Sequence, residues 1–244
     1  MILTDLNAPG GIGANCLLLQ FDGLNIVVDV GIHPKITGPT ALPRIDRLKD
    51  IRLDLIFLTH SHLDHLGALP VLARDHPSTP IIMSHDTGQF YRRMLQNSCT
   101  VMERQRMELG ITGYPLYSYR DIAICHRQVI GLNPGQPRHF EGISGDRISF
   151  TLHRAGHIPG AVGIMFEYRH RKILHTGDVL FSDTRLLDGA RFPEETVDTV
   201  ILETTRGATA RRASRESEME RLLECIEKTT SRGGSILIPT FALG

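Results

Sequence analysis

The sequence predicts an α/β protein in which two mixed β-sheets pack face to face and helices cover the outside. Three observations support this fold class. Segments with the character of strands repeatedly precede segments with the character of helices. Two pairs of strands are separated by turns short enough for hairpins, and long amphipathic segments follow the first strands. Hairpins give antiparallel pairing and strand–helix alternation gives parallel pairing, so the sheets should be mixed.

In the first part of the chain, the strands are runs of apolar and β-branched residues. Asp22-Gly23 is a strong hairpin signal between the first two runs. The predicted elements are strands at 15–21, 24–30, 54–59 and 79–84, a loop at 38–42, and helices at 46–50 and 66–73.

In the rest of the chain, an amphipathic helix is predicted over 86–110, with Phe90, Met94, Val101 and Met107 among its apolar positions. A second helix over 118–128 begins with Ser118 as its cap. The remaining predicted elements are strands at 147–153, 162–168, 172–175 and 196–202, a helix at 214–230 and a buried strand at 235–239.

Composition excludes several classes of protein. Lys+Arg and Asp+Glu both number 27, so no global basic field indicates nucleic-acid binding, although a local groove stays possible. We expect no membrane partner, because no apolar run is long enough to span a bilayer and the N-terminus is no signal peptide. The four cysteines form no CxxC pair, which indicates reduced thiols in a cytoplasmic protein.

Four side chains suited to metal binding crowd the segment that follows the strand at 54–59. They are His60, His62, Asp64 and His65. His60 and His62 share a face of an extended segment, and Asp64 and His65 follow after the chain turns. Imidazole together with carboxylate suits zinc or another first-row metal. This strand-to-helix turn is therefore the predicted metal site.

Three other strand ends present candidate side chains. They carry His157, which lies between Gly156 and Gly160, Asp178 in Thr-Gly-Asp, and Asp29. Six groups suffice for two ions, with three imidazoles (His60, His62 and His157) at one and Asp64 with His65 at the other. Asp178 can bridge both through its two oxygens. Such ions share and deprotonate a water and clamp an anionic substrate. For Asp29, a role at the site and simple capping of its own loop both stay open.

Other histidines are less informative. His175 is adjacent to the predicted site and is either a supporting residue or simply a strand residue. We expect His85 and His153 to be structural. The rest should be solvated, namely His33, His76, His126, His139 and His170.

The segments THSHLDHLG, AGH, TGD and VVDVG together resemble the ligand-bearing motifs of the metallo-β-lactamase superfamily. The resemblance implies that family's four-layer αββα sandwich, a pair of zinc ions, and metal ligands at His60, His62, Asp64, His65, His157 and Asp178. It sharpens to the β-CASP ribonucleases through RRMLQNS, PLYSYRDI, AGHIPGA, VILETTRGA and RGGSILIPTFALG. By that match Glu203 is an acidic residue expected to orient a histidine.

The family implies roles at the reaction centre for Asp64, Asp178, Glu203 and Asp29. Arg206 departs from the family pattern, which usually has tyrosine there. No histidine follows His175, whereas the family carries two more. The sequence therefore resembles an N-terminal portion, with a core at 1–208 and the beginning of a β-CASP domain at 209–244. Glu203, left without its histidine, should point to solvent or cap an amide, and the chain alone should be a poor nuclease.

The predicted function is zinc-dependent hydrolysis of RNA phosphodiesters by a two-metal-bridged hydroxide. The expected partners are an RNA substrate and either a second copy of the chain or a processing complex. Two alternatives stay open at this point. One is an ester or thioester hydrolase of the same fold, and the other is a non-catalytic subunit of an RNA-processing complex. The complete set of six ligand-type residues argues against the second alternative.

Overall fold

The computed structural model describes residues 1–7, 11–208, 214–240 and 243. The chain forms two compact units, Met1–Glu203 and Thr204–Gly244. The first unit contains both β-sheets and every predicted ligand residue, so its arrangement determines the site.

The first sheet has six strands in the order β1-β2-β3-β4-β5-β6. β1, β2 and β3 are antiparallel, with Phe21 opposite Leu24 at the predicted hairpin, and β3 to β6 run parallel. The strands are β1 Ile2–Asp5, β2 Leu17–Phe21, β3 Leu24–Val28, β4 Leu55–Phe57, β5 Ile81–Ser84 and β6 Val129–Leu132.

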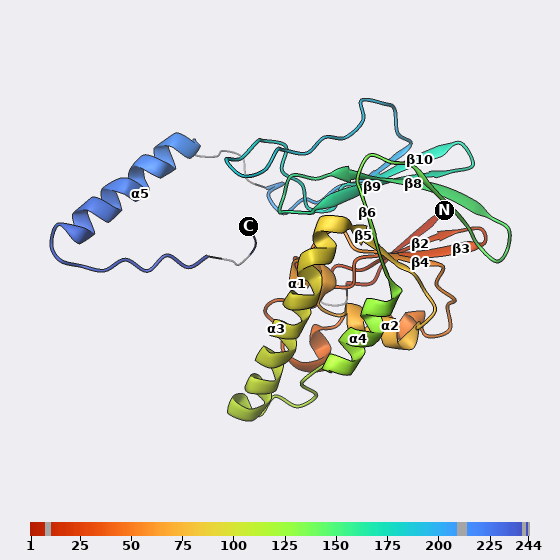
Figure 1. The fold of residues 1–244 in the computed structure, drawn as a ribbon, viewed down its shortest axis with the longest axis horizontal. Helices are drawn as coiled ribbons and strands as arrows, with labels where there is room; N and C mark the ends of the chain where they lie inside the picture. The colour runs from red at the N-terminus through yellow and green to blue at the C-terminus, as the bar shows by residue number, and fades with distance from the viewer. Residues whose placement is uncertain (8–10, 209–213, 241–242, 244) are drawn as a thin grey trace. The chain divides into compact units, whose positions relative to one another are not determined.

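The second sheet has five strands in the order β11-β10-β9-β8-β7. Antiparallel pairs join β7 to β10, and β11 closes the edge parallel to β10. The strands are β7 Arg138–Glu141, β8 Arg147–Arg154, β9 Val162–Tyr168, β10 Arg171–His175 and β11 Thr199–Ile201. Both sheets are mixed, and Figure 1 shows one lying over the other, as the sequence predicts.

Alternation along the strands builds two apolar cores. On β4, Leu55 and Phe57 face the second sheet, where Phe57 meets Phe150 and Phe166 edge-on at 4.9 and 5.2 Å between centroids. Ile56 between them faces the helices. Successive side chains of a strand point to opposite faces, so one strand contributes to both cores. Because apolar side chains fill the space between the layers, the polar side chains lie at the ends of the strands. The candidate ligands are among them.

The helices of this unit cover the outer face of the first sheet (Figure 1). They are α1 Leu63–Leu66, α2 Leu69–Asp75, α3 His85–Leu109 and α4 Tyr119–Gln128, with 3₁₀ turns η1 Gly38–Ala41 and η2 Ile45–Leu48. Ser118 caps α4 as predicted, in a reciprocal capping box with Asp121. The predicted helix over 66–73 is instead two helices. Any side chain at Gly67 would collide with Ile32 and with the carbonyl of Leu63.

The second unit contains α5, Arg215–Thr230, which begins after its cap Ser214 as predicted. No residue of α5 is buried. The prediction of a buried strand at 235–239 is wrong. The segment pairs with no described strand, and Leu237 is 90% exposed. Apolar character alone predicts burial only where a sheet accepts the segment. The predictions at 209–213, 241–242 and 244 lie outside the described residues. Throughout the described chain, no helix combines the length and the apolar character that a membrane span requires.

Candidate metal centre

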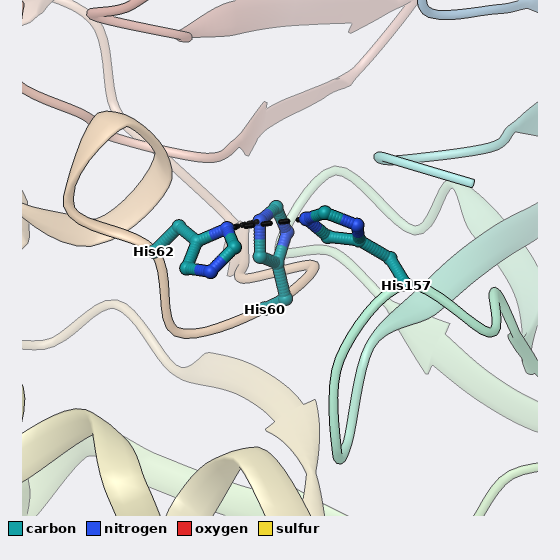
Figure 2. Close-up of side chains that lie close together, drawn as sticks. All are labelled: His60, His62 and His157. Atoms are coloured by element: carbon teal, nitrogen blue, oxygen red, sulfur yellow. Dashed lines mark hydrogen bonds between the residues drawn. The ribbon is translucent and has the colours of Figure 1, made fainter. Parts of the chain in front are cut away.

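The predicted ligands meet at one edge of the two-sheet sandwich. His60 and His62 follow β4, and His62 is the residue immediately before α1. His157 lies in the turn after β8, and Asp178 lies just beyond β10. Figure 2 shows the imidazoles of His60 and His62, from the loop between β4 and α1, pointing toward that of His157, from the turn after β8. The structure thus brings together residues that are almost 100 positions apart in sequence.

The three imidazoles have the spacing that a zinc ion requires. His60 Nε2 lies 3.2 Å from His62 Nδ1, and His157 Nε2 lies 3.1 Å from the same atom. Zinc–nitrogen bonds of about 2.0–2.1 Å in a tetrahedron put neighbouring nitrogens roughly 3.3 Å apart. The observed separations are close to that edge length. The donor set is therefore chemically and geometrically suited to a first-row metal ion.

A second group of potential ligands adjoins the first. His65 Nε2 lies 3.3 Å from Asp178 Oδ1 and 3.8 Å from Asp64 Oδ2. The other oxygen of Asp178, Oδ2, lies 3.7 Å from His157 Nε2 and 4.0 Å from His60 Nε2. Ligand atoms of His60, His65 and Asp178 all fall within 4.8 Å of one another. The two oxygens of Asp178 thus face different groups, which is the arrangement of a bridging carboxylate.

A buried carboxylate lies directly behind these ligands. Asp29 follows β3, is 2% exposed, and accepts a hydrogen bond from His65 Nδ1 at 2.8 Å. It also accepts bonds from the Thr59 backbone N–H at 2.8 Å and from the Thr59 hydroxyl. The same hydroxyl lies 3.0 Å from His60 Nδ1. A histidine whose Nδ1–H is held by a carboxylate presents Nε2 as the ligand atom. Asp29 therefore orients His65 directly and contacts His60 through Thr59.

Electrostatics separate the histidines into two kinds. Burial and the neighbouring imidazoles hold the pKa of His60 well below its ordinary value. Burial also lowers the pKa of His157, although Asp178 opposes the shift. Burial likewise opposes protonation of His65, but Asp29 and Asp178 outweigh it and raise the pKa of His65 well above its ordinary value. At neutral pH, His60 and His157 are therefore uncharged imidazoles with a lone pair available for a metal ion. At His65, a bound cation would replace a proton.

Glu203 and His175 lie close to the centre without joining either ligand group. Glu203 follows β11, and its Oε1 is 3.5 Å from the backbone N–H of Val179, the residue after Asp178. This contact agrees with the expectation that Glu203 caps an amide. His175 is buried, and its Nδ1 accepts a hydrogen bond from the Gly177 N–H at 3.0 Å. Its partner is therefore the backbone of the Thr-Gly-Asp turn.

Two residues at the site were missed by the sequence interpretation. Thr59 is fully buried between Asp29 and His60. The amide nitrogen of Asn15 lies 3.0 Å from His65 Nε2 and 3.2 Å from the carbonyl of Asp64. Thr59 stands directly before the first histidine, and that position is a signal that could have found it. Asn15 carries no comparable signal, because its approach depends on how β2 and α1 pack.

Comparison with known proteins identifies similar sequences over nearly the whole chain. The metallo-beta-lactamase superfamily matches residues 9–232. "Cleavage and polyadenylation specificity factor 73" of Drosophila melanogaster is 34% identical over 240 residues, covering 98% of this chain and 33% of the relative. "Endoribonuclease YSH1" of Saccharomyces cerevisiae is 30% identical over 98% of this chain and 30% of its own length. "Probable RNase MJ4" of Methanocaldococcus jannaschii is 30% identical over 95% of this chain and 51% of its own length. The chain therefore spans about a third to a half of these relatives.

Proposed function

Because the chain belongs to the metallo-β-lactamase superfamily, we propose that it contributes the metal centre of a zinc-dependent ribonuclease. Its relatives confirm the resemblance to the β-CASP ribonuclease branch that the motifs indicated. The observation that carries the proposal is the convergence of three imidazole nitrogens beside a carboxylate that faces both ligand groups. RNA is the proposed substrate because two of these relatives are named as ribonucleases.

We assign one zinc ion to His60, His62 and His157, and a second to Asp64 and His65, with Asp178 shared. Zinc, when bound, supplies Lewis acidity and lowers the pKa of water. Without a cation, the carboxylates of Asp64 and Asp178 would repel a phosphodiester. The proposed pair of dications would reverse that local charge and make the centre attractive to an anionic substrate.

The residues of the chain have separate tasks in this proposal. Asp178 holds the two ligand groups in register, because a single side chain contacts both. Asp29 holds the Nδ1–H of His65, so that Nε2 is the ring atom that would exchange its proton for a cation. Glu203 Oε1 accepts a hydrogen bond from the Val179 N–H and so helps to fix the backbone immediately after Asp178. These contacts preorganise the ligands before substrate arrives, which limits rearrangement during the reaction.

The second unit is proposed to begin the β-CASP domain, as the resemblance of residues 209–244 implies. The break between units at Glu203 and Thr204 lies close to the proposed boundary. The expected partners are RNA and either a second copy of the chain or an RNA-processing complex. Cytoplasmic location is proposed because all four cysteines are free thiols, three of them buried.

The test uses the zinc-loaded chain in excess over a labelled single-stranded RNA, so that slow cleavage is detected in a single turnover. No histidine follows His175 to act as the proton donor that the family resemblance implies, so the rate should be low. We expect metal-dependent cleavage that a chelator stops and that Asp178→Asn abolishes. Asn keeps the size of the side chain but loses the charge needed between two cations.

A thioester and a β-lactam provide the comparison substrates. Hydrolysis of either one, with RNA left intact, would replace the ribonuclease proposal by an esterase-type activity. Tight RNA binding without hydrolysis of any substrate would favour a non-catalytic subunit. Unchanged RNA cleavage by Asp178→Asn would contradict the two-metal assignment even if RNA is the substrate.

A further inference from the structure

A loop beside the metal centre carries an exposed aromatic ring that the proposed chemistry does not use. The loop covers residues 179–192, starting directly after Asp178, and is named here the 179–192 loop. Its start bonds to the turn that contains His157, since Leu180 N–H donates to the carbonyl of Ala155 at 2.9 Å. Its end bonds to the same segment, since Arg191 N–H donates to the carbonyl of Arg154 at 3.0 Å. The loop therefore lies against the residues that precede His157.

Internal hydrogen bonds hold the 179–192 loop in one shape. Ala190 N–H donates to the carbonyl of Leu180 at 2.7 Å and closes the base of the loop. Asp183 accepts bonds from the Gly189 N–H at 2.8 Å and from the Arg191 guanidinium at 2.9 Å. Any side chain on Gly189 would collide with the carbonyl of Phe181. The backbone at Phe181 therefore packs closely against Gly189.

Phe181 keeps its ring in solvent despite this rigid support. The residue is 62% exposed, and its ring centroid is 6.2 Å from that of Phe192, with the planes at 72°. Phe192 is half-buried and also contacts His153. Phe181 is three positions after Asp178, so their Cα atoms are at most about 11 Å apart. An exposed, rigidly held aromatic ring therefore stands within one or two nucleotides' reach of the centre.

The 179–192 loop carries no net charge that could attract RNA to the exposed ring. Asp183 and Asp188 balance Arg185 and Arg191, and Arg191 is already paired with Asp183. Arg185 is exposed and has no ion-pair or hydrogen-bond partner within the described parts of the chain. A neutral loop gives no general attraction to phosphate, so recognition here would depend on the π-face. Nucleobases stack on aromatic side chains regardless of base identity.

We propose that Phe181, supported by Phe192, is a stacking platform for a nucleobase of single-stranded RNA that flanks the metal centre. This inference rests on the proposed ribonuclease function for the identity of the ligand. One base–aromatic stack is worth about a 5- to 100-fold change in affinity, judged by alanine substitution. Because the loop is neutral, the contribution of Phe181 should change little with salt, unlike contacts between Lys or Arg and phosphate.

The absence of tryptophan from the chain allows a direct test. Phe181→Trp introduces a single fluorescent reporter at the platform, and Tyr119→Trp is the matched control. Tyr119 is also an exposed aromatic residue, at 48%, but it lies on α4 among the helices. We expect oligoadenylate RNA to quench the first reporter saturably and not the second. An oligomer of the same length that keeps the ribose-phosphate backbone but lacks the bases should quench neither reporter.

Affinity measurements on variants without tryptophan complete the test. Phe181→Ala should weaken oligoadenylate binding about 5- to 100-fold at both low and moderate salt, whereas Phe181→Tyr should restore it. The exposed ring leaves no core cavity when removed, and unchanged zinc content verifies the fold. Absence of quenching together with wild-type affinity in Phe181→Ala would overturn the platform. Quenching without RNA cleavage by the wild-type chain would instead overturn the ribonuclease proposal and leave the platform standing.

Discussion

Substitution of Asp29 by Asn tests how the buried carboxylate supports the centre. Its two oxygens accept bonds from three donors, namely the Thr59 N–H, the Thr59 hydroxyl and His65 Nδ1–H. The amide of the Asp29→Asn variant would have one oxygen and one NH₂ group. The NH₂ group would therefore replace an acceptor next to at least one of these three donors. Bonds to a charged acceptor contribute about 1.5–3 kcal/mol each, against about 0.5–1.5 kcal/mol for a neutral one. We therefore expect Asp29→Asn to lower the free energy of unfolding by about 2–4 kcal/mol.

The same substitution should weaken metal binding through the tautomer of His65. If the new NH₂ group faces His65 Nδ1, that nitrogen must accept, and the ring proton moves to Nε2. A protonated Nε2 cannot bind a metal ion. If the NH₂ group faces Thr59 instead, the bond to His65 loses its charge. Changes to such supporting groups typically reduce metal affinity about 10- to 100-fold.

Two measurements separate these effects. Urea denaturation of the metal-free protein gives the free energy of unfolding, and competition with a chromophoric chelator gives zinc affinity. Asp54→Asn is the matched control, because Asp54 is also buried and accepts the Asn25 N–H at 2.9 Å, with Arg52 as its ion-pair partner. It should lose stability but keep zinc affinity within about twofold. Wild-type zinc affinity in Asp29→Asn would refute the argument from the tautomer.

Three further predictions concern single residues of the first unit. His62→Ala removes the imidazole that both neighbouring rings contact, and tight zinc binding at the three-histidine group should disappear in elemental analysis. Gly156→Ala places a Cβ 2.3 Å from the carbonyl oxygen of Leu180 at a φ of +71°, and should lower both the free energy of unfolding and zinc affinity. For His76, burial lowers the pKa, so the unfolded chain takes up a proton more readily than the folded one. Stability should fall as pH drops below about 6.5, less steeply in His76→Gln by urea titration.

Each of these predictions has its own control and its own contrary result. His139→Ala removes an exposed imidazole whose Nδ1 hydrogen-bonds to the Ser149 hydroxyl far from the predicted ligands, and unchanged zinc content in both histidine variants would show that His62 is not a ligand. Gly135→Ala has a similar φ of +86° but meets nothing within 4 Å, so equal losses in the two glycine variants would exclude the collision. Identical pH slopes in wild-type protein and His76→Gln would show that other histidines account for the acid dependence.

The sequence was most informative where the local pattern and the packing agree. The hairpin at Asp22-Gly23, the cap at Ser118 and the hairpin of β9 and β10 all depend on short-range signals. β1, β6 and β7 were not predicted. All three are four-residue strands at sheet edges with no buried residue, so they lack the alternation of buried and exposed positions that marks a half-buried strand. At 235–239 the apolar pattern was strong, but the described chain offers that segment no neighbouring strand.

The sequence interpretation left Asp29 between two roles, a cap of its own loop and a part of the site. Within the described chain, the hydrogen bonds of its carboxylate go to residues outside its own loop. Its carboxylate accepts the Thr59 N–H, 30 residues away, and the His65 Nδ1–H, 36 residues away. Neither spacing has a local signature, because pairing of β3 with β4 creates both contacts. A buried carboxylate needs several hydrogen-bond donors to offset its desolvation. Here those donors are the proposed ligand His65 and Thr59, whose hydroxyl also contacts His60. Stability and metal affinity should therefore fall together at Asp29, whereas at Asp54 they should separate.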